Sequence, residues 1–403
     1  MIKATNLIKT GIAWIPEIPS NWELKRIKLL FDFNKNIVGK TSSNYDVLSL
    51  TTKGVIKRDL ESGMGKFPAS FDGYQIIKPN SIMLCLFDMD VTPRVVGHVD
   101  DNGIISAAYT NIIPKQGINS KYYYYYFILQ DKNKSLLALG TGIRITLNKD
   151  FFGTLKIPVP PLVVQNSIVA YLDKKNSEID KFIKNKERLI GLLEEERKEM
   201  IDKIITTFDN VQTNIKPLKY LARLVSDLAN KLSEGETYLA LENIESWTGK
   251  IDLNIGDSEF ESTVKKFKST DVLFSKLRPY LAKVVIPDFK GVCVSEILVL
   301  RPSKIIDKEF LFYKLISRRI IDFIDSSTYG SKMPRASYDF IGKIEIEYPI
   351  DLDIQKKFVA EIKEKEFAIE NLKKKFKKEI VSIKEYREAL ITDLVTGKRS
   401  IPE

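Results

Sequence analysis

The residue types that catalysis most often needs are scarce in this sequence or stand at the wrong spacing. His98 is the single histidine among 403 residues, which nearly excludes histidine-bound metals and Ser-His-Asp triads. The Gly-Lys-Thr at 39–41 resembles the end of a phosphate-binding loop, but Asn34 stands where that loop needs glycine. No G-x-G-x-x-G motif follows an expected strand, and the Glu-Ile-Lys at 361–363 lies inside an expected long helix. We therefore predict neither a catalytic centre nor a metal site in this chain.

Lys and Arg gather instead in segments that we expect to be loops between strands, together with Tyr, Asn and Ser. Arginine pairs with guanine edges, Lys and Arg neutralise phosphates, and the uncharged polar side chains add phosphate and base contacts. The candidate DNA-binding residues are Lys53, Arg58, Arg94, Tyr109, Asn111, Arg144, Lys149, Lys276, Arg278, Tyr280, Lys283, Ser331, Lys332 and Arg335. Each of them alone is better explained as a solvated surface residue. The prediction depends on the same loops being basic in both halves of the chain.

The composition is that of a folded protein with a polyanionic partner. Apolar residues make up 44% and charged residues 29%, which argues against disorder. Lys and Arg outnumber Asp and Glu by 63 to 53, and a net charge of +10 favours nucleic acid. The two cysteines, Cys85 and Cys293, stand in apolar runs and are expected to be buried thiols. Without a signal peptide or a membrane-spanning stretch, we expect a cytoplasmic protein.

The chain contains an internal repeat that is clearest in two long helical segments. Residues 165–206 align with residues 355–396 without a gap, and their apolar positions are three and four residues apart. Such a stripe packs along another helix, so we expect the two segments to form an antiparallel coiled coil. Each helix should be roughly 60 Å long. The expected seam residues are Ile168, Leu172, Ile179, Ile190, Leu193, Arg197, Ile204, Phe358, Ile362, Ile369, Ile380, Ile383, Arg387 and Leu394.

Two arginines, Arg197 and Arg387, stand at equivalent seam positions of the repeat. A charge at a seam position costs stability unless it is paired. Each arginine could fix the register of the helices through a carboxylate on the opposite helix, or could anchor a partner subunit. We favour the register role.

The repeat continues upstream into two globular segments. DFFGTLKI at 150–157 corresponds to DFIGKIEI at 339–346, and short alternating strand patterns correspond further back. We therefore expect an α+β fold in which two similar domains are separated by a long antiparallel two-helix coiled coil, with internal pseudo-twofold duplication. The expected segments are residues 1–157, 158–212, 213–347 and 348–403. The KYYYYYF run at 121–127 is expected to begin a helix packed in its domain, with a base-stacking platform as the lesser alternative.

Several motifs resemble the specificity subunits of type I restriction–modification systems. They are GIAWIPEIPSNW at 11–22, IPVPPL at 157–162, LRPYLAKVV at 277–285, GVCVSEILVLRP at 291–302 and GSKMPRASYDFIG at 330–342. One departure is YPIDLD at 348–353, which lacks the double proline of the first helix entry. That difference bears on the stiffness of the second entry.

The resemblance implies two target recognition domains, each reading one half of a split sequence of double-stranded DNA, with helices that set their spacing. It also implies that the helices bind two methyltransferase subunits, and that restriction subunits join the full complex. S-adenosylmethionine, ATP and Mg would then be bound by those partners and not by this chain. Two alternatives remain open at this point. They are a coiled-coil adaptor without sequence readout, and a methyltransferase or nuclease with unfamiliar motifs.

Overall fold

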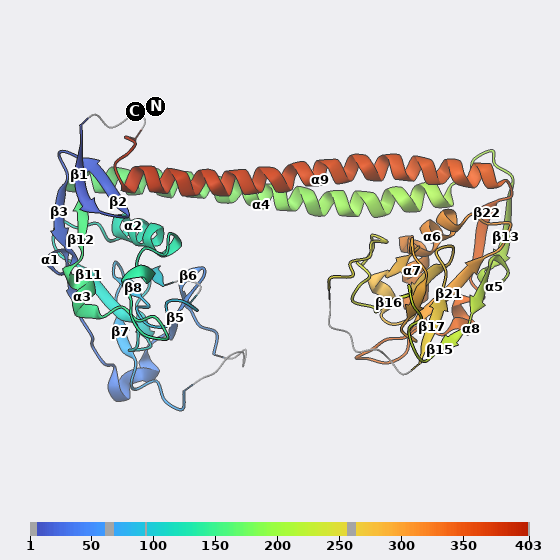
Figure 1. Cartoon of the computed structure of the whole chain (residues 1–403), viewed down its shortest axis with the longest axis horizontal. Coiled ribbons are helices and arrows are strands. Elements are labelled where there is room, and N and C mark those ends of the chain that lie inside the picture. The colour runs from blue at the N-terminus through green and yellow to red at the C-terminus, as the bar shows by residue number, and fades with distance from the viewer. Residues whose placement is uncertain (1–5, 61–67, 93–94, 256–262, 402–403) are drawn as a thin grey trace. The chain divides into compact units, whose positions relative to one another are not determined.

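The computed structural model describes residues 6–60, 68–92, 95–255 and 263–401, which form two compact units (Figure 1). Unit 1 consists of Met1–Lys184 and Glu379–Glu403, and unit 2 consists of Asn185–Lys378. Each unit contains a domain of short strands and helices that packs on parts of two long helices. These helices are α4 (Leu162–Thr206) and α9 (Leu352–Val395), so each unit holds about half of each.

The ends of the long helices follow from local chemistry. Helix α4 begins directly after two prolines, and the Pro161 carbonyl accepts a hydrogen bond from the amide of Gln165 at 3.0 Å. Helix α9 begins after Asp351, whose carboxylate accepts the amide of Asp353 at 2.8 Å in place of a helical partner. It ends at Val395, and Gly397 follows with a φ of 72°. A Cβ at Gly397 would lie 2.4 Å from Pro19, so only glycine fits there.

In each unit the two long helices run antiparallel and share a core with the domain. In unit 1, Leu172 near the start of α4 packs in one cluster with Leu390 and Leu394 near the end of α9. In unit 2, Ile204 near the end of α4 shares a cluster with Ile362 near the start of α9. The expected α+β fold with a duplicated domain and an antiparallel coiled coil is therefore confirmed.

The expected seam residues differ in how far they are buried. The fully buried ones are Ile168, Leu172, Ile179, Arg197, Ile204, Ile362, Ile369 and Leu394. The half-buried ones are Ile190, Leu193, Phe358, Ile380, Ile383 and Arg387. Most of the second group lie toward the middle of a helix, where the opposite helix covers a side chain and no domain packs beside it.

The domain of unit 1 is built on a four-stranded antiparallel sheet in the order β4-β11-β8-β9. The strands are β4 (Phe31–Phe33), β11 (Thr110–Pro114), β8 (Ile82–Leu84) and β9 (Val96–His98). Smaller pairs are β1 (Leu7–Ile12) with β2 (Ile15–Pro19), β3 (Glu23–Arg26) with β12 (Lys156–Val159), β5 (Leu48–Thr51) with β6 (Gly54–Lys57), and β7 (Gln75–Ile77) with β10 (Gly103–Ile105). The helices are α1 (Ile27–Leu30), α2 (Ser120–Lys132) and α3 (Lys149–Thr154).

The domain of unit 2 repeats this topology, with a sheet in the order β14-β21-β18-β19. The strands are β14 (Ala222–Val225), β21 (Ile297–Pro302), β18 (Val272–Ser275) and β19 (Val284–Val285). A second sheet joins β15 (Leu228–Ala229), β17 (Val264–Phe267), β20 (Gly291–Cys293) and β16 (Thr237–Leu239), and β13 (Thr213–Pro217) pairs with β22 (Glu345–Pro349). The helices are α5 (Leu218–Leu221), α6 (Lys308–Ile316), α7 (Arg318–Asp325) and α8 (Tyr338–Ile341).

The segment boundaries that we expected fall close to element ends. The boundary after residue 157 lies inside β12, because that strand continues to Val159 in its pairing with β3. The boundary after residue 347 likewise lies inside β22.

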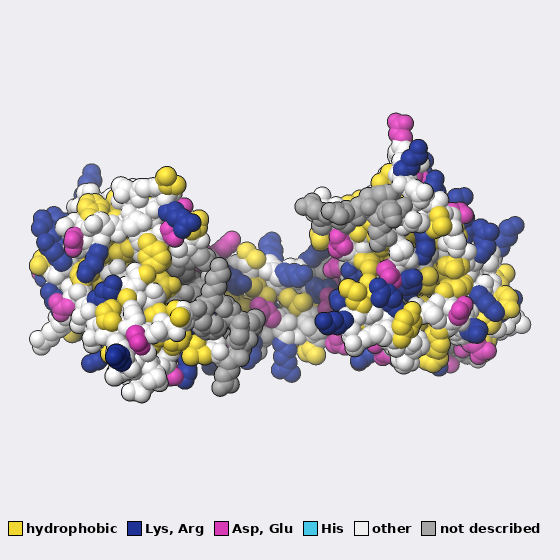
Figure 2. Space-filling model, turned by 90° about the horizontal axis from the view of Figure 1, so that it is seen from below, with side chains coloured by type: hydrophobic (Ala, Val, Ile, Leu, Met, Phe, Trp, Pro, Cys, Tyr) yellow, Lys and Arg dark blue, Asp and Glu magenta, His cyan; other side chains and the backbone are white. Residues whose placement is uncertain are grey.

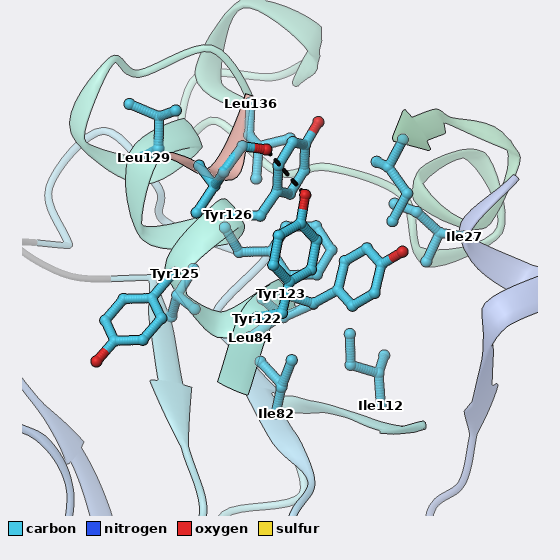
Figure 3. Close-up of a cluster of buried hydrophobic side chains, with 14 of the residues drawn as sticks. Ile27, Ile82, Leu84, Ile112, Tyr122, Tyr123, Tyr125, Tyr126, Leu129 and Leu136 are labelled. Carbon is cyan, nitrogen blue, oxygen red and sulfur yellow. Dashed lines mark hydrogen bonds between the residues drawn. The ribbon is translucent and has the colours of Figure 1, made fainter. Parts of the chain in front are cut away.

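The tyrosine-rich run forms the aromatic core of unit 1 (Figure 3). Tyr122, Tyr123 and Tyr126 on α2 are at most 1% exposed. The Tyr122 hydroxyl donates to the Val395 carbonyl at 2.9 Å, and that of Tyr123 donates to Pro158 at 3.0 Å. The expectation of a packed helix is confirmed, and the alternative of a base-stacking platform is wrong because these rings are not accessible.

Two further expectations concern the cysteines and the membrane. Cys85 and Cys293 are free, buried thiols, as expected, and burial raises the pKa of Cys85. Among the residues that the structure describes, no helix is long and apolar enough to cross a membrane.

Candidate nucleic-acid interface

Two loops lie side by side at one end of the main sheet in unit 1. The first follows β8 and includes Asp88 and Asp90, and the second is the turn at 140–147. The Ile145 carbonyl accepts the amide of Met89 at 3.0 Å, and the Ile145 amide donates to the Asp90 carboxylate at 3.1 Å. Thr141 and Thr146 exchange two backbone hydrogen bonds of 3.0 Å, which close the turn. We call residues 86–92 and 140–147 the unit 1 loop pair.

Unit 2 has the same arrangement after β18, in residues 276–282 and 329–336, which we call the unit 2 loop pair. The amide of Arg278 donates to the Pro334 carbonyl at 2.7 Å, and its guanidinium donates to the Lys332 carbonyl at 3.3 Å. Tyr329 and Arg335 exchange backbone hydrogen bonds of 3.1 and 3.0 Å, which close the second turn. The two loop pairs thus share a backbone frame while their side chains differ.

Left-handed backbone conformations mark both loop pairs. Asp88 and Arg278 follow equivalent strands, and each has a φ of 48°. In unit 2, Ala282 within the loop pair has a φ of 45°, and Trp247 beside the loop pair has a φ of 66°. Non-glycine residues pay roughly 1–3 kcal/mol for such conformations, and these residues cluster at functional sites. Both loop pairs thus contain left-handed residues, and the same conformation also occurs elsewhere, at Asn6, Asn80, Lys134 and Asn210.

Trp247 connects the unit 2 loop pair to helix α4. Its indole nitrogen donates to the Tyr280 carbonyl at 3.1 Å, and its amide donates to the Ala282 carbonyl at 3.2 Å. The Trp247 carbonyl in turn accepts the guanidinium of Arg197 at 2.6 Å. Helix α4 therefore holds the loop through the buried Arg197, and the Lys198 ammonium on the same helix lies 4.7 Å from the centre of the Trp247 ring.

The cations that we predicted in the loop pairs are partly neutralised. The Arg144 guanidinium lies 3.3 Å from the Asp88 carboxylate but is 77% exposed. In unit 2 the Glu296 carboxylate accepts from Arg335 at 3.0 Å and lies 3.8 Å from the Lys276 ammonium. Lys332 and Ser331 are exposed at the turn, and Tyr280 is 45% exposed. Figure 2 shows lysine and arginine side chains scattered among apolar ones on the visible face of each unit.

Lys283 belongs to the same region but has a largely internal role. Its ammonium donates to the Leu241 carbonyl at 2.6 Å, and burial lowers its pKa, with Glu242 opposing that shift. An ammonium that is hydrogen-bonded inward in this way stabilises the loop and is less accessible to a polyanion.

Of the other predicted residues of unit 1, Tyr109 contacts the loop pair, whereas Lys53, Arg58 and Lys149 lie elsewhere in the domain. Lys53 is exposed in the turn between β5 and β6 and lines a groove of about 790 Å³ with α2 and α9. Arg58 is half-buried just after β6, and Lys149 lies at the start of α3 with its ammonium 5.7 Å from the Phe33 ring. Tyr109 is half-buried against Phe87 at a ring distance of 5.8 Å, and burial raises its pKa.

Two predicted residues, Asn111 and Arg94, differ from the others in burial or in lying outside the described residues. Asn111 lies on the interior strand β11 and is only 5% exposed, which argues against contact with DNA. The sequence pattern predicts a loop at Asn111, whereas in the structure strand β11 already begins at Thr110. Arg94 lies outside the described residues.

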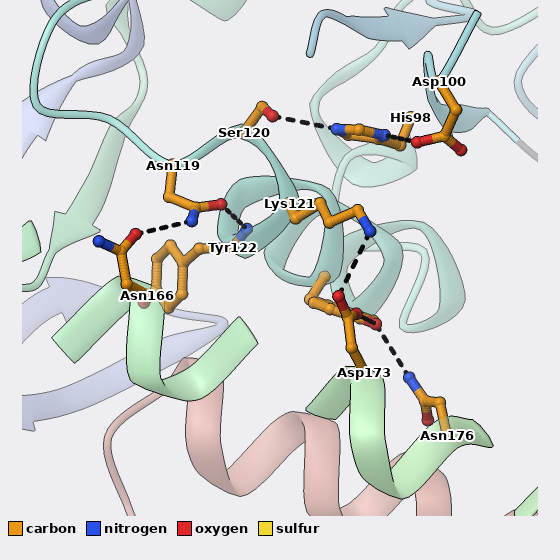
Figure 4. A network of polar contacts seen from close by, with 10 residues as sticks. His98, Asp100, Asn119, Ser120, Lys121, Tyr122, Asn166, Asp173 and Asn176 are labelled. Carbon is orange, nitrogen blue, oxygen red and sulfur yellow. Dashed lines mark hydrogen bonds and ion pairs between the residues drawn. The ribbon is translucent and has the colours of Figure 1, made fainter. Parts of the chain in front are cut away.

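A network of polar contacts, which the sequence did not reveal, docks the domain of unit 1 on α4 (Figure 4), and similar contacts dock the domain of unit 2 on α9. In unit 1, the Gln165 side chain accepts the amide of Asn119 at 2.9 Å, and the Tyr125 hydroxyl donates to Asp173 at 2.6 Å. In unit 2, the Gln355 side chain accepts the amide of Asp307 at 2.7 Å. The signal was available, because Gln165 and Gln355 open the ungapped part of the repeat.

The same network contains the single histidine. The His98 ring is 6% exposed and lies between the Asp100 carboxylate at 2.9 Å and the Ser120 hydroxyl at 3.0 Å. Burial lowers the pKa of His98, and Asp100 opposes that shift. His98 thus supports the start of α2. Among the described residues, no group of three or more His, Cys, Asp or Glu side chains could hold a metal.

Both seam arginines have carboxylate partners on the opposite helix. Arg197 lies 2.5 Å from Glu366 in unit 2, and Arg387 lies 2.5 Å from Asp180 in unit 1. The Glu366 carboxylate also accepts the Tyr313 hydroxyl at 2.7 Å, which satisfies a second side of a buried charge. These contacts are those that a register role needs, and the role itself remains a prediction.

Two copies of an α+β domain, each with the same loop frame and each docked on long antiparallel helices, define an internally duplicated two-domain protein as the class. Residues 19–190 and 226–381 match the type I restriction modification DNA specificity domain. The chain therefore belongs to the family of type I restriction–modification specificity subunits.

Relatives agree with this assignment. The chain is 26% identical over 414 residues to the type I restriction enzyme MjaVIII specificity subunit of Methanocaldococcus jannaschii, covering 94% of this chain and 93% of that protein. It is 30% identical over 132 residues to the EcoDI specificity subunit of Escherichia coli, which is 31% of this chain and 29% of that protein. The chain thus matches less than a third of the EcoDI subunit.

Solved structures share the fold. A chain from work on complex assembly and conformational transition of the type I R-M system has a TM-score of 0.64 at 12% identity, covering 95% of this chain and 99% of that one. The HsdS subunit of Thermoanaerobacter tengcongensis has a TM-score of 0.52 at 14% identity, covering 95% and 98%.

Proposed function

We propose that this specificity subunit reads a bipartite sequence of double-stranded DNA, with one recognition domain for each half, and that it has no active site of its own. The observation that carries this proposal is the repeated loop pair. Two equivalent backbone frames carry a left-handed residue at the same place and different side chains. The charged ones are Arg144, Asp88 and Asp90 in unit 1, and Lys276, Arg278, Lys332 and Arg335 in unit 2. A repeated frame with different side chains suits the reading of two different half-sites.

The long helices are the proposed binding surface for two methyltransferase subunits, and restriction subunits would join the full complex. In each unit these helices expose apolar side chains, as an interaction surface requires. They include Val381 and Tyr386 in unit 1, and Leu189, Leu192, Phe367 and Leu372 in unit 2. S-adenosylmethionine, ATP and Mg would be bound by those partners.

The proposal is tested with the chain reconstituted with its modification subunits. Duplexes are selected for binding, and their affinity at physiological salt is compared with that of scrambled duplexes. We expect a preference for a split target, with affinity that falls steeply as salt rises because phosphate contacts dominate. Equal affinity for both duplexes would support an adaptor without sequence readout, and methyl transfer by this chain alone would support an enzyme.

Substitutions in the unit 2 loop pair should affect one half-site only. Arg278→Asn keeps a residue that tolerates the left-handed backbone, and Lys332→Gln removes an exposed cation. We expect each to weaken specific binding by roughly 1–3 kcal/mol when the residue contacts a base, and to relax selection in a single half-site. Arg223→Gln, on strand β14, removes an exposed arginine outside the loop pair and is the matched control. Relaxed selection in both half-sites would contradict the division of labour between domains.

A further inference from the structure

An isoleucine stands fully exposed at the tip of the unit 1 loop pair. Ile143 has a relative exposure of 102%, between Gly142 and the exposed Arg144. Burying such a side chain is worth roughly 1.5–3 kcal/mol, which the isolated subunit forgoes. A single exposed apolar residue is common on protein surfaces, so exposure alone decides nothing.

The second domain repeats the feature at the equivalent turn. Met333 is 52% exposed in the unit 2 loop pair, and Tyr329 at the base of the same turn is 64% exposed. Gly142 and Gly330 each follow the residue that opens the turn. Their φ values are 97° and 93°, so the backbone enters both turns in the same conformation. The sequences of the two turns differ, and each holds an exposed apolar side chain, directly after Gly142 in unit 1 and three residues after Gly330 in unit 2.

The turn that presents Ile143 is well held. The two hydrogen bonds between Thr141 and Thr146 close it, and Ile145 is bonded through its amide and its carbonyl to the neighbouring loop. A tip that is fixed in this way loses little conformational freedom when it binds. It is also flanked by Arg144, a cation that can contact phosphate as the tip approaches a groove.

We propose that Ile143 and Met333 are apolar wedges that enter a groove of the duplex and partly unstack one base step in each half-site. The inference rests on the proposed function, since it requires the loop pairs to face DNA. Apolar side chains such as Ile and Met insert between base steps and kink the duplex, and pyrimidine–purine steps yield most easily. Each domain would therefore select a deformable step in addition to bases that it contacts directly.

The experiment places 2-aminopurine at successive positions of the selected duplex and records its fluorescence in the complex with modification subunits, without S-adenosylmethionine. Unstacking raises this fluorescence. We expect a rise at one step in the half-site read by unit 1. Ile143→Ala should remove that rise and weaken specific binding about tenfold, whereas Ile143→Leu should retain both. Leu29→Ala, which removes an exposed apolar side chain from α1, is the control.

The outcomes separate the wedge from the proposed function. If the complex prefers the selected duplex but no fluorescence rise depends on Ile143, the wedge is overturned while DNA reading stands. Weaker binding of Ile143→Ala without unstacking would likewise overturn it in favour of a contact with base edges. If the complex shows no preference for the selected duplex, the proposed function itself fails. The same scan with Met333→Ala tests the second half-site.

Discussion

Lys314 on α6 is a buried lysine on which two effects compete. Its ammonium lies 4.6 Å from the centre of the Phe208 ring and 5.6 Å from that of Phe310, and such contacts favour the charged form by up to about 2 kcal/mol. Burial disfavours the charged form and lowers the pKa of Lys314 to about 7, although Glu347 opposes this shift. Desolvation therefore outweighs the aromatic contacts.

The lowered pKa makes a prediction about stability and pH. A lysine whose pKa falls on folding destabilises the folded state below about pH 7, and this cost disappears as the pH rises toward the unfolded value of 10.5. Lys314→Met removes the charge, so we expect the variant to be more stable than the parent at pH 7 by on the order of 4 kcal/mol. Urea unfolding at pH 7, 8 and 9 should show the difference shrinking by about 1.4 kcal/mol per unit.

Lys308→Met, on the same helix but with a less buried lysine, is the control for the loss of a lysine charge from α6. The stability difference between Lys314→Met and the parent could instead stay constant across this pH range. That result would mean that Lys314 does not titrate there.

The sequence predicted which loops carry cations better than it predicted the side chains that those cations contact. Arg144, Arg278 and Lys332 could be chosen because cations between strand patterns are visible in a sequence. The neutralisation of Arg335 could not be foreseen, because Glu296 is far from it along the chain and is brought near only by the fold. Ile143 and Met333 could have been singled out, since both lie in the glycine-containing segments, from Gly140 and from Gly330, that correspond loosely in the repeat.

Among the elements, the two domains dock on their helices through ion pairs of opposite polarity. On α2, Lys121 lies 3.3 Å from Asp173 of α4. At the equivalent place in unit 2, Glu309 of α6 lies 2.6 Å from Lys363 of α9. A domain transferred to the other helix would meet a like charge, Lys121 against Lys363 or Glu309 against Asp173. The reversal therefore favours each domain on its own helix.

This pairing predicts a coupling that a double-mutant cycle measures. Glu309→Lys and Lys363→Glu each create a like-charge contact, and each should lower stability by about 0.5–1 kcal/mol because the pair is partly exposed. The double variant restores the pair with reversed polarity and should recover most of the loss. The measurement is urea unfolding of the four proteins. Additive effects of the two changes would show that the pair does not contribute to docking.

The helices themselves were the element that the sequence predicted best, because one period persists through each of them without a gap. The sheet order was beyond sequence reasoning, since it depends on pairings such as β11 with β4 between residues far apart in the chain. The uneven burial along the seam could not be predicted either, because a periodic pattern does not show where a domain covers the helices.

For the whole molecule, α4 and α9 each run from one unit into the other as continuous helices. Inserting one heptad into both helices, after Lys184 and after Lys378, should lengthen the DNA spacer that the complex accepts. A heptad adds about 10 Å and returns the apolar stripe to nearly the same face. Mapping of methylated sites in cells that carry the variant measures the spacer.

A five-residue insertion at the same two places is the control. It adds about 7.5 Å but turns the apolar stripe by roughly 140°, so it should abolish activity instead of lengthening the spacer. An active heptad variant with an unchanged spacer would rule out the helices as a ruler.

Unit 1 is completed from both sides of unit 2 in the chain, and this affects how the protein emerges from the ribosome. Unit 2 can close once residue 378 is made. The first half of α4 must wait for Leu390 and Leu394, which cover Ile168 and Leu172. At 5–20 residues per second, the roughly 195 residues between Lys184 and Glu379 take about 10 to 40 s to translate. During that time a nascent apolar stripe lies open to chaperones and to neighbouring chains on the polysome.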